Sequence, residues 1–182
     1  SILDCNWKVP VENFIGDGYH VGWAHAAALD AIQSPLTSMK GNAPGYEPAK
    51  SGIQVATHGG HGMGIIWDMA AALHVNPAYH EWLAYRTAQV REQQGEWAAK
   101  LYNGHWDASI FPNCSFLYGT NTFKHWQPAG PRSIEVFTWT LVETEMPEEL
   151  KQYLAVMNMM TFGTAGMLET DDGENMEGCT NT

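Results

Sequence analysis

The chain has 182 residues, of which 45% are apolar and 16% are charged, and its formal net charge is −11. This length and apolar content are typical of one folded domain with a substantial core, and they argue against a disordered chain. The acidic excess disfavours binding to nucleic acid or to an anionic membrane surface. We recognise no secretory signal and no apolar run of membrane-spanning length, so we expect neither export nor a membrane span.

The first predicted helix runs from about Val11 to Ile32 and follows Pro10, a residue favoured at helix starts. Gly16, Gly18 and Gly22 interrupt it, and each weakens a regular helix by roughly 1 kcal/mol. Two interpretations stay open: local deformability beside a metal site, or close packing of the helix on a sheet.

Asp17, His20 and His25 lie in this segment among apolar and aromatic residues. Neutral imidazole is a good ligand for iron, zinc, copper or nickel. On a regular helix five residues turn about 500°, which leaves the two histidines roughly 140° apart. Both can reach one ion if the helix carries a π-bulge or begins between them. The alternative is that each is a core histidine satisfied by hydrogen bonds.

A third ligand is predicted near the other end of the chain, in the acidic segment Leu168–Glu177, which contains Asp171 and Asp172. Two histidines and one carboxylate make a facial triad, which leaves open positions on ferrous iron. Spacing alone does not decide between the two aspartates. The alternative interpretation of the acidic run is a solvated surface turn.

A long loop and two strands are predicted next. Residues Ser34–Lys50 are rich in Ser, Gly and Pro, and a loop of this length is often a lid or a mouth element. Strand patterns follow at Ile53–Thr57 and Met63–Ala71, around a glycine-rich turn. His58 and His61 fall in this turn and are interpreted as loop histidines rather than metal ligands.

The pattern at Pro77–Tyr102 predicts one long helix, with a bend at Gly95. Residues Gly104–Tyr118 are strand-rich, and Pro112 suggests an edge strand or a bulge there.

Two further strands, Thr122–Gln127 and Ser133–Thr144, form the clearest predicted pair. Apolar residues on both faces of the second predict a central strand with helices covering one side.

Pro147 marks a helix start, and Gly163 and Gly166 end this helix before the acidic segment. Its apolar stripe, interpreted as core, consists of Leu150, Tyr153, Leu154, Met157 and Met160. Strands and helices without regular alternation predict the α+β class.

Three cysteines, Cys5, Cys114 and Cys179, lie far apart without a C-x-x-C pair. This spacing predicts reduced thiols in a cytoplasmic protein and excludes a local iron–sulfur or zinc-knuckle motif.

Short motifs in one order along the chain carry a family resemblance. They are Asn6-Trp7-Lys8, Glu12-Asn13-Phe14, Asp17-x-x-His20 with His25, Gly62-Met63-Gly64 with Trp67-Asp68, His105 with Phe111-Pro112-Asn113, Phe123-Lys124 with Trp126-x-Pro128, Glu143 with Met146-Pro147-Glu148, Phe162-Gly163-x-Ala165-Gly166, and Glu169-x-Asp171-Asp172. Together they resemble the α-subunit of Rieske-type aromatic-ring-hydroxylating dioxygenases, most nearly its naphthalene and phenanthrene (polycyclic aromatic) branch.

The resemblance implies a helix-grip (START/Bet v 1-like) fold, in which an antiparallel sheet wraps around a long helix and a hydrophobic cavity. The family also carries an N-terminal Rieske domain, whose 2Fe–2S cluster has cysteine and histidine ligands. That domain is absent from this sequence. We therefore expect residues 1–182 to be a single partial catalytic domain from the middle of a longer polypeptide.

The resemblance also implies that His20, His25 and Asp172 hold mononuclear Fe(II). Asp172 is preferred because it matches the family's ligand position, and Asp171 is the second choice. Asp17 would bridge the iron site and the Rieske histidine of a neighbouring subunit; its alternative role is to stabilise the first turn of a helix.

Asn13 is assigned to the catalytic site on the same resemblance. Substrate-lining positions are assigned to Phe14, Val21, Ile66, Leu73, His105, Asp107, Leu117, Phe162 and Leu168. Asp107 stands where the naphthalene branch usually has Asn, which leaves the orientation of the substrate open, and its alternative role is that of a turn residue. Leu168 stands where that branch has Trp, which implies a roomier pocket for arenes of three or more rings.

The implied activity is O2-dependent cis-dihydroxylation of aromatic hydrocarbons. Electrons would come from NADH through a reductase, a ferredoxin and the Rieske cluster, in an α3 or α3β3 assembly with a small β-subunit. We expect the isolated chain to be inactive, because nothing in it delivers electrons to iron. The alternatives are a non-catalytic carrier of hydrophobic ligands with the same helix-grip fold, and a zinc hydrolase using the same ligands.

Overall fold

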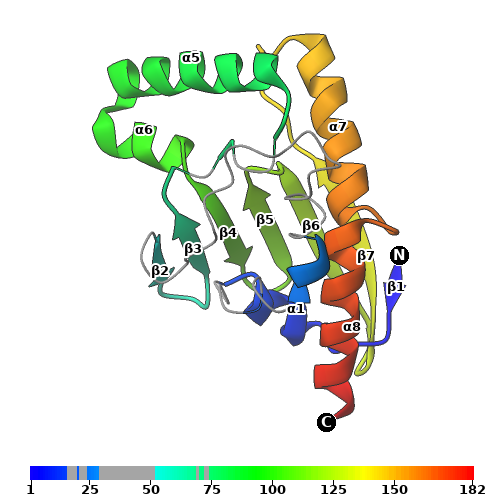
Figure 1. Ribbon diagram of the computed structural model, residues 1–182. Coiled ribbons are helices and arrows are strands. Elements are labelled where there is room, and N and C mark those ends of the chain that lie inside the picture. The colour runs from blue at the N-terminus through cyan, green and yellow to red at the C-terminus, as the bar shows by residue number, and fades with distance from the viewer. Residues whose placement is uncertain (16–19, 21–23, 29–51, 69, 72–73) are drawn as a thin grey trace.

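The computed structural model describes residues 1–15, 20, 24–28, 52–68, 70–71 and 74–182. In this part of the chain seven strands form one antiparallel sheet, in the order β1-β7-β6-β5-β4-β3-β2 (Figure 1). The sheet is an open meander from β2 to β7, with β1 added beyond β7. The strands are β1 (Ile2–Leu3), β2 (Gly52–Ala56), β3 (Gly62–Ile66), β4 (His105–Ile110), β5 (Cys114–Tyr118), β6 (Thr122–Gly130) and β7 (Ser133–Thr140).

Helices lie on one face and at one end of this sheet. In Figure 1, α1, α7 and α8 lie in front of the β5–β7 side, while α5 and α6 lie beyond the upper ends of β3, β4 and β5. The predicted α+β class, with helices on an antiparallel sheet, is confirmed. The helices are α1 (Lys8–Asn13), α5 (Pro77–Gln94), α6 (Glu96–Tyr102), α7 (Glu148–Phe162) and α8 (Met167–Asn181).

The two faces of the sheet differ in burial. On β6 the side chains of Thr122, Lys124 and Trp126 point to the helix-covered face and are fully buried. On β7, Phe137 is 39% exposed and Trp139 is 48% exposed on the opposite face. Strand β7 is paired on both sides, by β6 and by the two-residue β1, and helices cover one of its faces, as predicted, but it lies second from the edge of the sheet.

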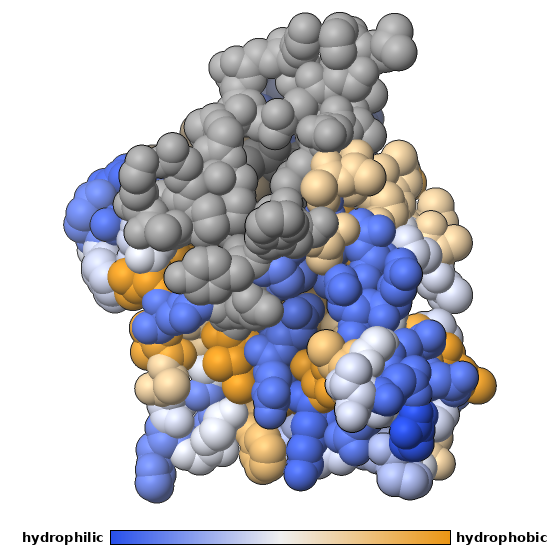
Figure 2. Space-filling model, turned by 60° about the horizontal axis from the view of Figure 1, so that its bottom comes forward, coloured by the Kyte–Doolittle hydropathy of each residue, from blue (hydrophilic) through white to orange (hydrophobic). Residues whose placement is uncertain are grey.

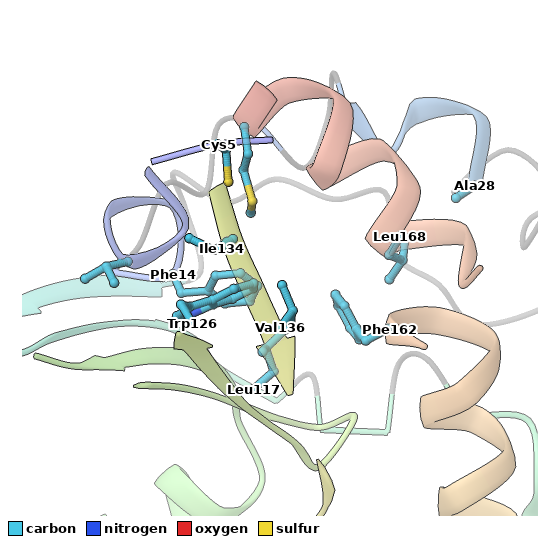
Figure 3. Packing of buried hydrophobic residues seen from close by; sticks show 11 residues of the cluster. Cys5, Phe14, Ala28, Leu117, Trp126, Ile134, Val136, Phe162 and Leu168 are labelled. Atoms are coloured by element: carbon cyan, nitrogen blue, oxygen red, sulfur yellow. The ribbon is translucent and has the colours of Figure 1, made fainter. Parts of the chain in front are cut away.

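One buried cluster connects the inner face of the sheet with α1, α7 and α8. Figure 3 shows Trp126 and Val136 on its sheet side, and Phe162 and Leu168 on its helix side. The rings of Phe14 and Trp126 have centroids 5.4 Å apart. Packing of this kind fixes the end of α1 against β6.

A buried chain of hydroxyl groups also anchors α1 to the sheet. Ser109 Oγ donates to the carbonyl oxygen of Val11 at 2.7 Å and lies 3.2 Å from Ser115 Oγ. Trp126 Nε1 donates to Ser115 Oγ at 2.9 Å. Hydrogen bonds therefore satisfy these polar groups without water.

Gly95 divides the helix predicted at Pro77–Tyr102 into α5 and α6. Its φ is +90° and its ψ is 175°, a backbone conformation almost restricted to glycine. At the other end of α5, the side chain of Asn76 accepts a hydrogen bond from the backbone N–H of Ala78 at 3.0 Å. The predicted long helix with a bend at Gly95 is therefore two separate helices, which end and begin on either side of this residue.

Several predicted strand boundaries also differ from those observed. Residues Gly104–Tyr118 form the hairpin β4–β5, and Pro112 lies in its turn after a cis peptide bond rather than in an edge strand. The strand predicted to reach Ala71 ends at Ile66, because Trp67 and Asp68 form a turn. Strand β6 continues through Pro128 to Gly130, with an irregular register there.

The first predicted helix begins earlier than expected, as α1 spans Lys8–Asn13. Its predicted continuation lies partly outside the described residues, as does the whole loop at Ser34–Lys50.

The last two helices, α7 and α8, agree only in part with the predictions. Helix α7 begins directly after Pro147, as predicted. Its apolar stripe is buried at Leu150 and Leu154, but Met160 is 52% exposed, so the stripe is shorter than predicted. The acidic segment is no solvated turn, because it forms α8 and buries Asp172.

The surface carries mixed polarity. Figure 2 shows exposed apolar residues in several separate areas among hydrophilic ones on the face drawn there. The three cysteines are free thiols, as predicted. Within the described ranges, no helix combines the length and the apolar character needed to cross a membrane.

Candidate metal centre

His20, His25 and Asp172 converge although some 150 residues of chain separate them. One ligand atom from each lies within 4.8 Å of the others. His20 Nε2 lies 3.4 Å and His25 Nε2 lies 3.3 Å from the same oxygen, Asp172 Oδ1. The two imidazole rings meet edge to face, with centroids 5.3 Å apart and an angle of 71° between their planes.

Helix α8 presents Asp172 from its buried side. Its buried residues recur at helical spacing and form one stripe that faces the sheet and α1: Leu168, Glu169, Asp172, Gly173 and Met176. Asp172 therefore enters the interior from the middle of a helix whose apolar neighbours are packed. This support keeps the carboxylate in place without a flexible loop.

The charge of Asp172 is stabilised inside the protein. Burial alone would raise the pKa of this carboxyl group, but the imidazoles of His20 and His25 outweigh burial and hold the pKa at about 2. Burial would likewise lower the pKa of His25, but Asp172 and then Asp171 raise it. The site thus contains a carboxylate across the whole neutral pH range.

Asp171 orients one of the two imidazoles. Its Oδ2 accepts a hydrogen bond from His25 Nδ1 at 3.2 Å. A proton on Nδ1 leaves Nε2 of His25 as the lone-pair nitrogen, and this is the nitrogen that faces Asp172. The two aspartates that the sequence does not distinguish therefore have different positions: Asp172 lies between the histidines and Asp171 lies behind His25.

The three side chains fit a metal ion on one further observation. Asp172 Oδ1 is buried, and no described residue donates a well-aligned hydrogen bond to it, although ring nitrogens of His20 and His25 lie 3.4 and 3.3 Å away. Donor atoms about 2.1 Å from an ion lie about 3 Å apart at a right angle, close to the observed separations. Two imidazoles and one carboxylate are the donor set of mononuclear iron sites with open positions.

Lys124 and Glu169 form a buried ion pair beside this group, which the sequence analysis missed. Lys124 is fully buried on β6, and its ammonium donates to Glu169 on α8. Burial lowers the pKa of Lys124 and raises the pKa of Glu169. The available signal was the alternation in β6, where Lys124 stands between Thr122 and Trp126 on the buried face.

His105 and Asp107 lie on the same inner face, at the β3 side of the sheet. Asp107 Oδ1 is buried, lies 3.3 Å from His105 Nε2 and has no hydrogen-bond partner among the described residues. Gly119 has φ +109°, and a Cβ there would lie 2.3 Å from His105 Nδ1. Glycine at this position is what admits the His105 ring.

Four of the predicted substrate positions lie in the buried cluster between the sheet and the helices α1, α7 and α8: Phe14, Leu117, Phe162 and Leu168 (Figure 3). Ile66 pairs with His105 across β3 and β4, and Leu117 pairs with Asp107 across β4 and β5. The sheet register therefore places Ile66, His105, Asp107 and Leu117 on one face. Their contact with substrate stays a prediction.

The remaining predicted residues are the end of α1, three residues that the structure does not describe, and two loop histidines. Asn13 ends α1 and is half-buried. Asp17, Val21 and Leu73 lie outside the described residues, so their assigned roles stay predictions. His58 and His61 are exposed, and His61 Nδ1 accepts a hydrogen bond from the backbone N–H of Phe111 at 3.0 Å.

His74 is a second buried histidine without a sequence signal, and it lies far from this group along the chain. Its Nε2 donates to the carbonyl oxygen of Gly119, and its Nδ1 lies 3.2 Å from the hydroxyl of Tyr153. Burial lowers the pKa of His74 to about 4, so this imidazole is neutral at pH 7. No motif marks it, because its partners are 45 and 79 residues away.

Comparison with known proteins places these observations in a family. Residues 2–181 match the family described as ring hydroxylating alpha subunit (catalytic domain). The large oxygenase component of the naphthalene 1,2-dioxygenase system of Pseudomonas aeruginosa is 41% identical over 179 residues, which are 97% of this chain and 40% of that protein. The biphenyl 2,3-dioxygenase subunit alpha of Rhodococcus jostii (strain RHA1) is 37% identical over 182 residues, covering 96% of this chain and 38% of that protein.

The fold agrees with these sequence matches. A crystal structure of a naphthalene 1,2-dioxygenase mutant bound to phenanthrene superimposes with a TM-score of 0.87 and 36% identity, and the match covers 100% of this chain and 41% of that one. This chain thus spans about two fifths of the length of these relatives. The chain belongs to the catalytic-domain family of ring-hydroxylating alpha subunits.

Proposed function

We propose that this chain is the catalytic part of a dioxygenase that converts polycyclic aromatic hydrocarbons to cis-dihydrodiols, with ferrous iron held by His20, His25 and Asp172. One observation carries the proposal: two imidazole nitrogens and one buried carboxylate oxygen converge within 4.8 Å of one another. Family membership supports iron over other ions at this donor set.

When bound, ferrous iron would supply the redox chemistry that activates O2, because three protein ligands leave positions open. The chain's own residues would prepare the site. Asp171 holds the proton on His25 Nδ1, so that Nε2 is available as a ligand. The surrounding apolar side chains exclude water, which protects a reactive site from wasteful side reactions.

The proposed substrate is a neutral arene of two or more rings. Three named relatives act on or bind naphthalene, biphenyl or phenanthrene. In this chain Phe14, Leu117, Phe162 and Leu168 offer apolar surface in one cluster, which suits such rings. Leu168 is smaller than the Trp of the naphthalene branch, so we propose that arenes of three or more rings are accepted.

Electron delivery requires further components. We propose that electrons pass from NADH through a reductase, a ferredoxin and a 2Fe–2S Rieske cluster, and that Asp17 links that cluster to the iron site. A small β-subunit and an α3 or α3β3 assembly complete the proposal. The relatives' description as components of dioxygenase systems supports a multi-component arrangement.

Metal analysis of the intact polypeptide that carries this chain tests the proposal. We expect one ferrous ion per chain, and a nitric oxide adduct of the anaerobically reconstituted site that is visible by electron paramagnetic resonance. Asp172→Ala should lose both signals, while Glu174→Gln, at an exposed position of α8, should keep them. Zinc that resists replacement and supports hydrolysis would contradict the oxygenase, and so would ligand binding without any metal.

A further inference from the structure

The ion pair of Lys124 and Glu169 is buried next to aromatic side chains. The Lys124 side chain is 0% exposed and that of Glu169 is 7% exposed. The ammonium lies 5.0 Å from the ring centroid of Trp126 and 5.3 Å from that of Phe162. Lys124 is the one buried lysine or arginine among the described residues.

Stability alone does not account for such a pair. Taking two charges out of water costs several kcal/mol for each ion, and apolar residues of similar volume are often equally stable or more stable. Inside a cluster made of aromatic and aliphatic side chains, an apolar pair would pack without that cost. We therefore look for a role of the two charges that apolar side chains cannot perform.

Glu169 stands one helical turn before Asp172 on the same buried stripe of α8. Residues three apart on a helix are neighbours, with Cβ atoms about 5–6 Å apart. Lys124 and Glu169 both interact electrostatically with Asp172. Two carboxylates thus face the same interior, although the group of three ligands contains only Asp172.

We propose that Lys124 holds the Glu169 carboxylate away from the metal centre and thereby keeps Asp172 as its one carboxylate ligand. The inference rests on the proposed function, because it presupposes an ion at His20, His25 and Asp172. Without the ammonium, the best partner for a buried carboxylate near a dication is the dication itself, since ferrous iron accepts carboxylate oxygens as ligands. A fourth protein ligand would occupy a position that the reaction requires to be open.

Lys124 is accordingly a positioning residue, and it acts through Glu169. A purely structural role would be different, because the pair would then only fasten α8 to β6. The two roles make opposite predictions for removal of both charges. If Lys124 restrains Glu169, the lysine becomes dispensable for the metal site once Glu169 can no longer bind a metal.

The experiment compares wild type, Lys124→Met and the double variant Lys124→Met/Glu169→Gln in the intact polypeptide. Each is loaded anaerobically with iron(II) or with cobalt(II), and the probes are nitric oxide binding to iron and the visible absorption of cobalt. For Lys124→Met we expect loss of the nitric oxide signal and weaker cobalt absorption, because an added ligand raises the coordination number. For the double variant we expect both signals to return to the wild-type level. Glu169→Gln alone should resemble wild type.

The outcomes separate the two proposals. A wild-type protein that binds no metal defeats the proposed function itself. A wild-type protein with metal, together with unchanged spectra in Lys124→Met, overturns only the role of Lys124. A double variant that folds but does not regain the signals also overturns the role of Lys124. The ion pair would then serve only to pack α8 against β6.

Lys124→Met leaves a buried carboxylate without its partner, and this can prevent folding. If Lys124→Met does not fold, Lys124→Gln is used in its place, because the amide of Gln still donates a hydrogen bond but restrains Glu169 less. It should show the same spectral changes at smaller size, and wild-type spectra in this variant would overturn the inference.

Discussion

The hydrogen bond between Asp171 and His25 shows how one side chain prepares another. Asp171 Oδ2 lies 3.2 Å from His25 Nδ1, while His25 Nε2 faces Asp172. Carboxylates in this position fix the tautomer of a ligating histidine and raise its basicity, and losing one typically costs roughly 10–100-fold in metal affinity. We expect Asp171→Ala to weaken cobalt(II) binding by roughly tenfold or more, as measured by titration of the metal-free protein.

Glu174 provides the matched control for this prediction. It lies three residues further along α8, is exposed, and belongs to no ion pair found among the described residues. Glu174→Gln removes the same unit of charge from the same helix, so it should leave the affinity unchanged. Equal affinity in Asp171→Ala and wild type would show that Asp171 plays no part in the site.

His74 gives the molecule a pH-dependent stability. In the folded state burial holds its pKa at about 4, against an ordinary value of 6.5. Below pH 6.5 the unfolded chain therefore binds a proton that the folded protein refuses, and stability falls as the pH falls toward 4. The loss amounts to about 3 kcal/mol over this interval, and above pH 6.5 this group has no effect.

Urea denaturation at pH 7 and pH 4.5 measures this effect. His74→Gln keeps a donor for the carbonyl oxygen of Gly119 but does not titrate, so its stability should fall less than that of wild type. His58→Gln, at an exposed histidine, should keep the wild-type dependence. Parallel losses in wild type and His74→Gln would remove His74 as the cause.

At the scale of elements, Gly95 sets the break between α5 and α6. Its φ of +90° with ψ of 175° is strained for any residue with a Cβ, although a Cβ there would meet no atom within 4 Å. Gly95→Ala should therefore destabilise the protein by about 1–3 kcal/mol through the backbone alone. Gly178→Ala, inside α8 with equally open space, should stabilise it by about 0.5–1 kcal/mol. Opposite shifts of the urea midpoint are expected, and stabilisation by Gly95→Ala would contradict this explanation.

Most elements were predictable because their signals are local. Pro147 with two glutamates marks the start of α7, and the alternation at Ser133–Thr140 marks β7. The break at Gly95 was less visible, since glycine inside a helical pattern either bends or ends a helix. The position of β7 near the sheet edge depends on β1, whose two residues carry almost no pattern of their own.

The residues of the candidate site likewise divide into those with a local sequence signal and those that only the fold brings together. His20, His25 and Asp172 could be named because they lie in short motifs, and the resemblance chose Asp172 over Asp171. The pair of Lys124 and Glu169 could not be named, because 45 residues separate its members and only the packing of α8 on β6 brings them together. The restraint on His105 by Gly119 likewise depends on a positive φ that sequence does not reveal.

At the scale of the whole molecule, a metal ion would join the two ends of the chain. His20 and His25 come from the N-terminal segment, and Asp172 comes from the last helix. An ion that binds the folded protein and not the unfolded one stabilises it by about 2.7 kcal/mol at a hundred times its dissociation constant. For a domain of 182 residues that gain corresponds to a rise in Tm of roughly 5–10 °C, and the rise is smaller in a longer polypeptide that unfolds as one unit.

Thermal unfolding of the intact polypeptide, with cobalt(II) added or removed by a chelator, measures this linkage. We expect the metal-dependent rise in wild type and its loss in both His20→Ala and Asp172→Ala, because each removes one end of the connection. The exposed His58, changed to Ala, should leave the rise intact and exclude binding by surface histidines. If Asp172→Ala kept the full rise while His20→Ala lost it, the ion would be held by the N-terminal segment alone. The two ends of the chain would then not be linked through metal.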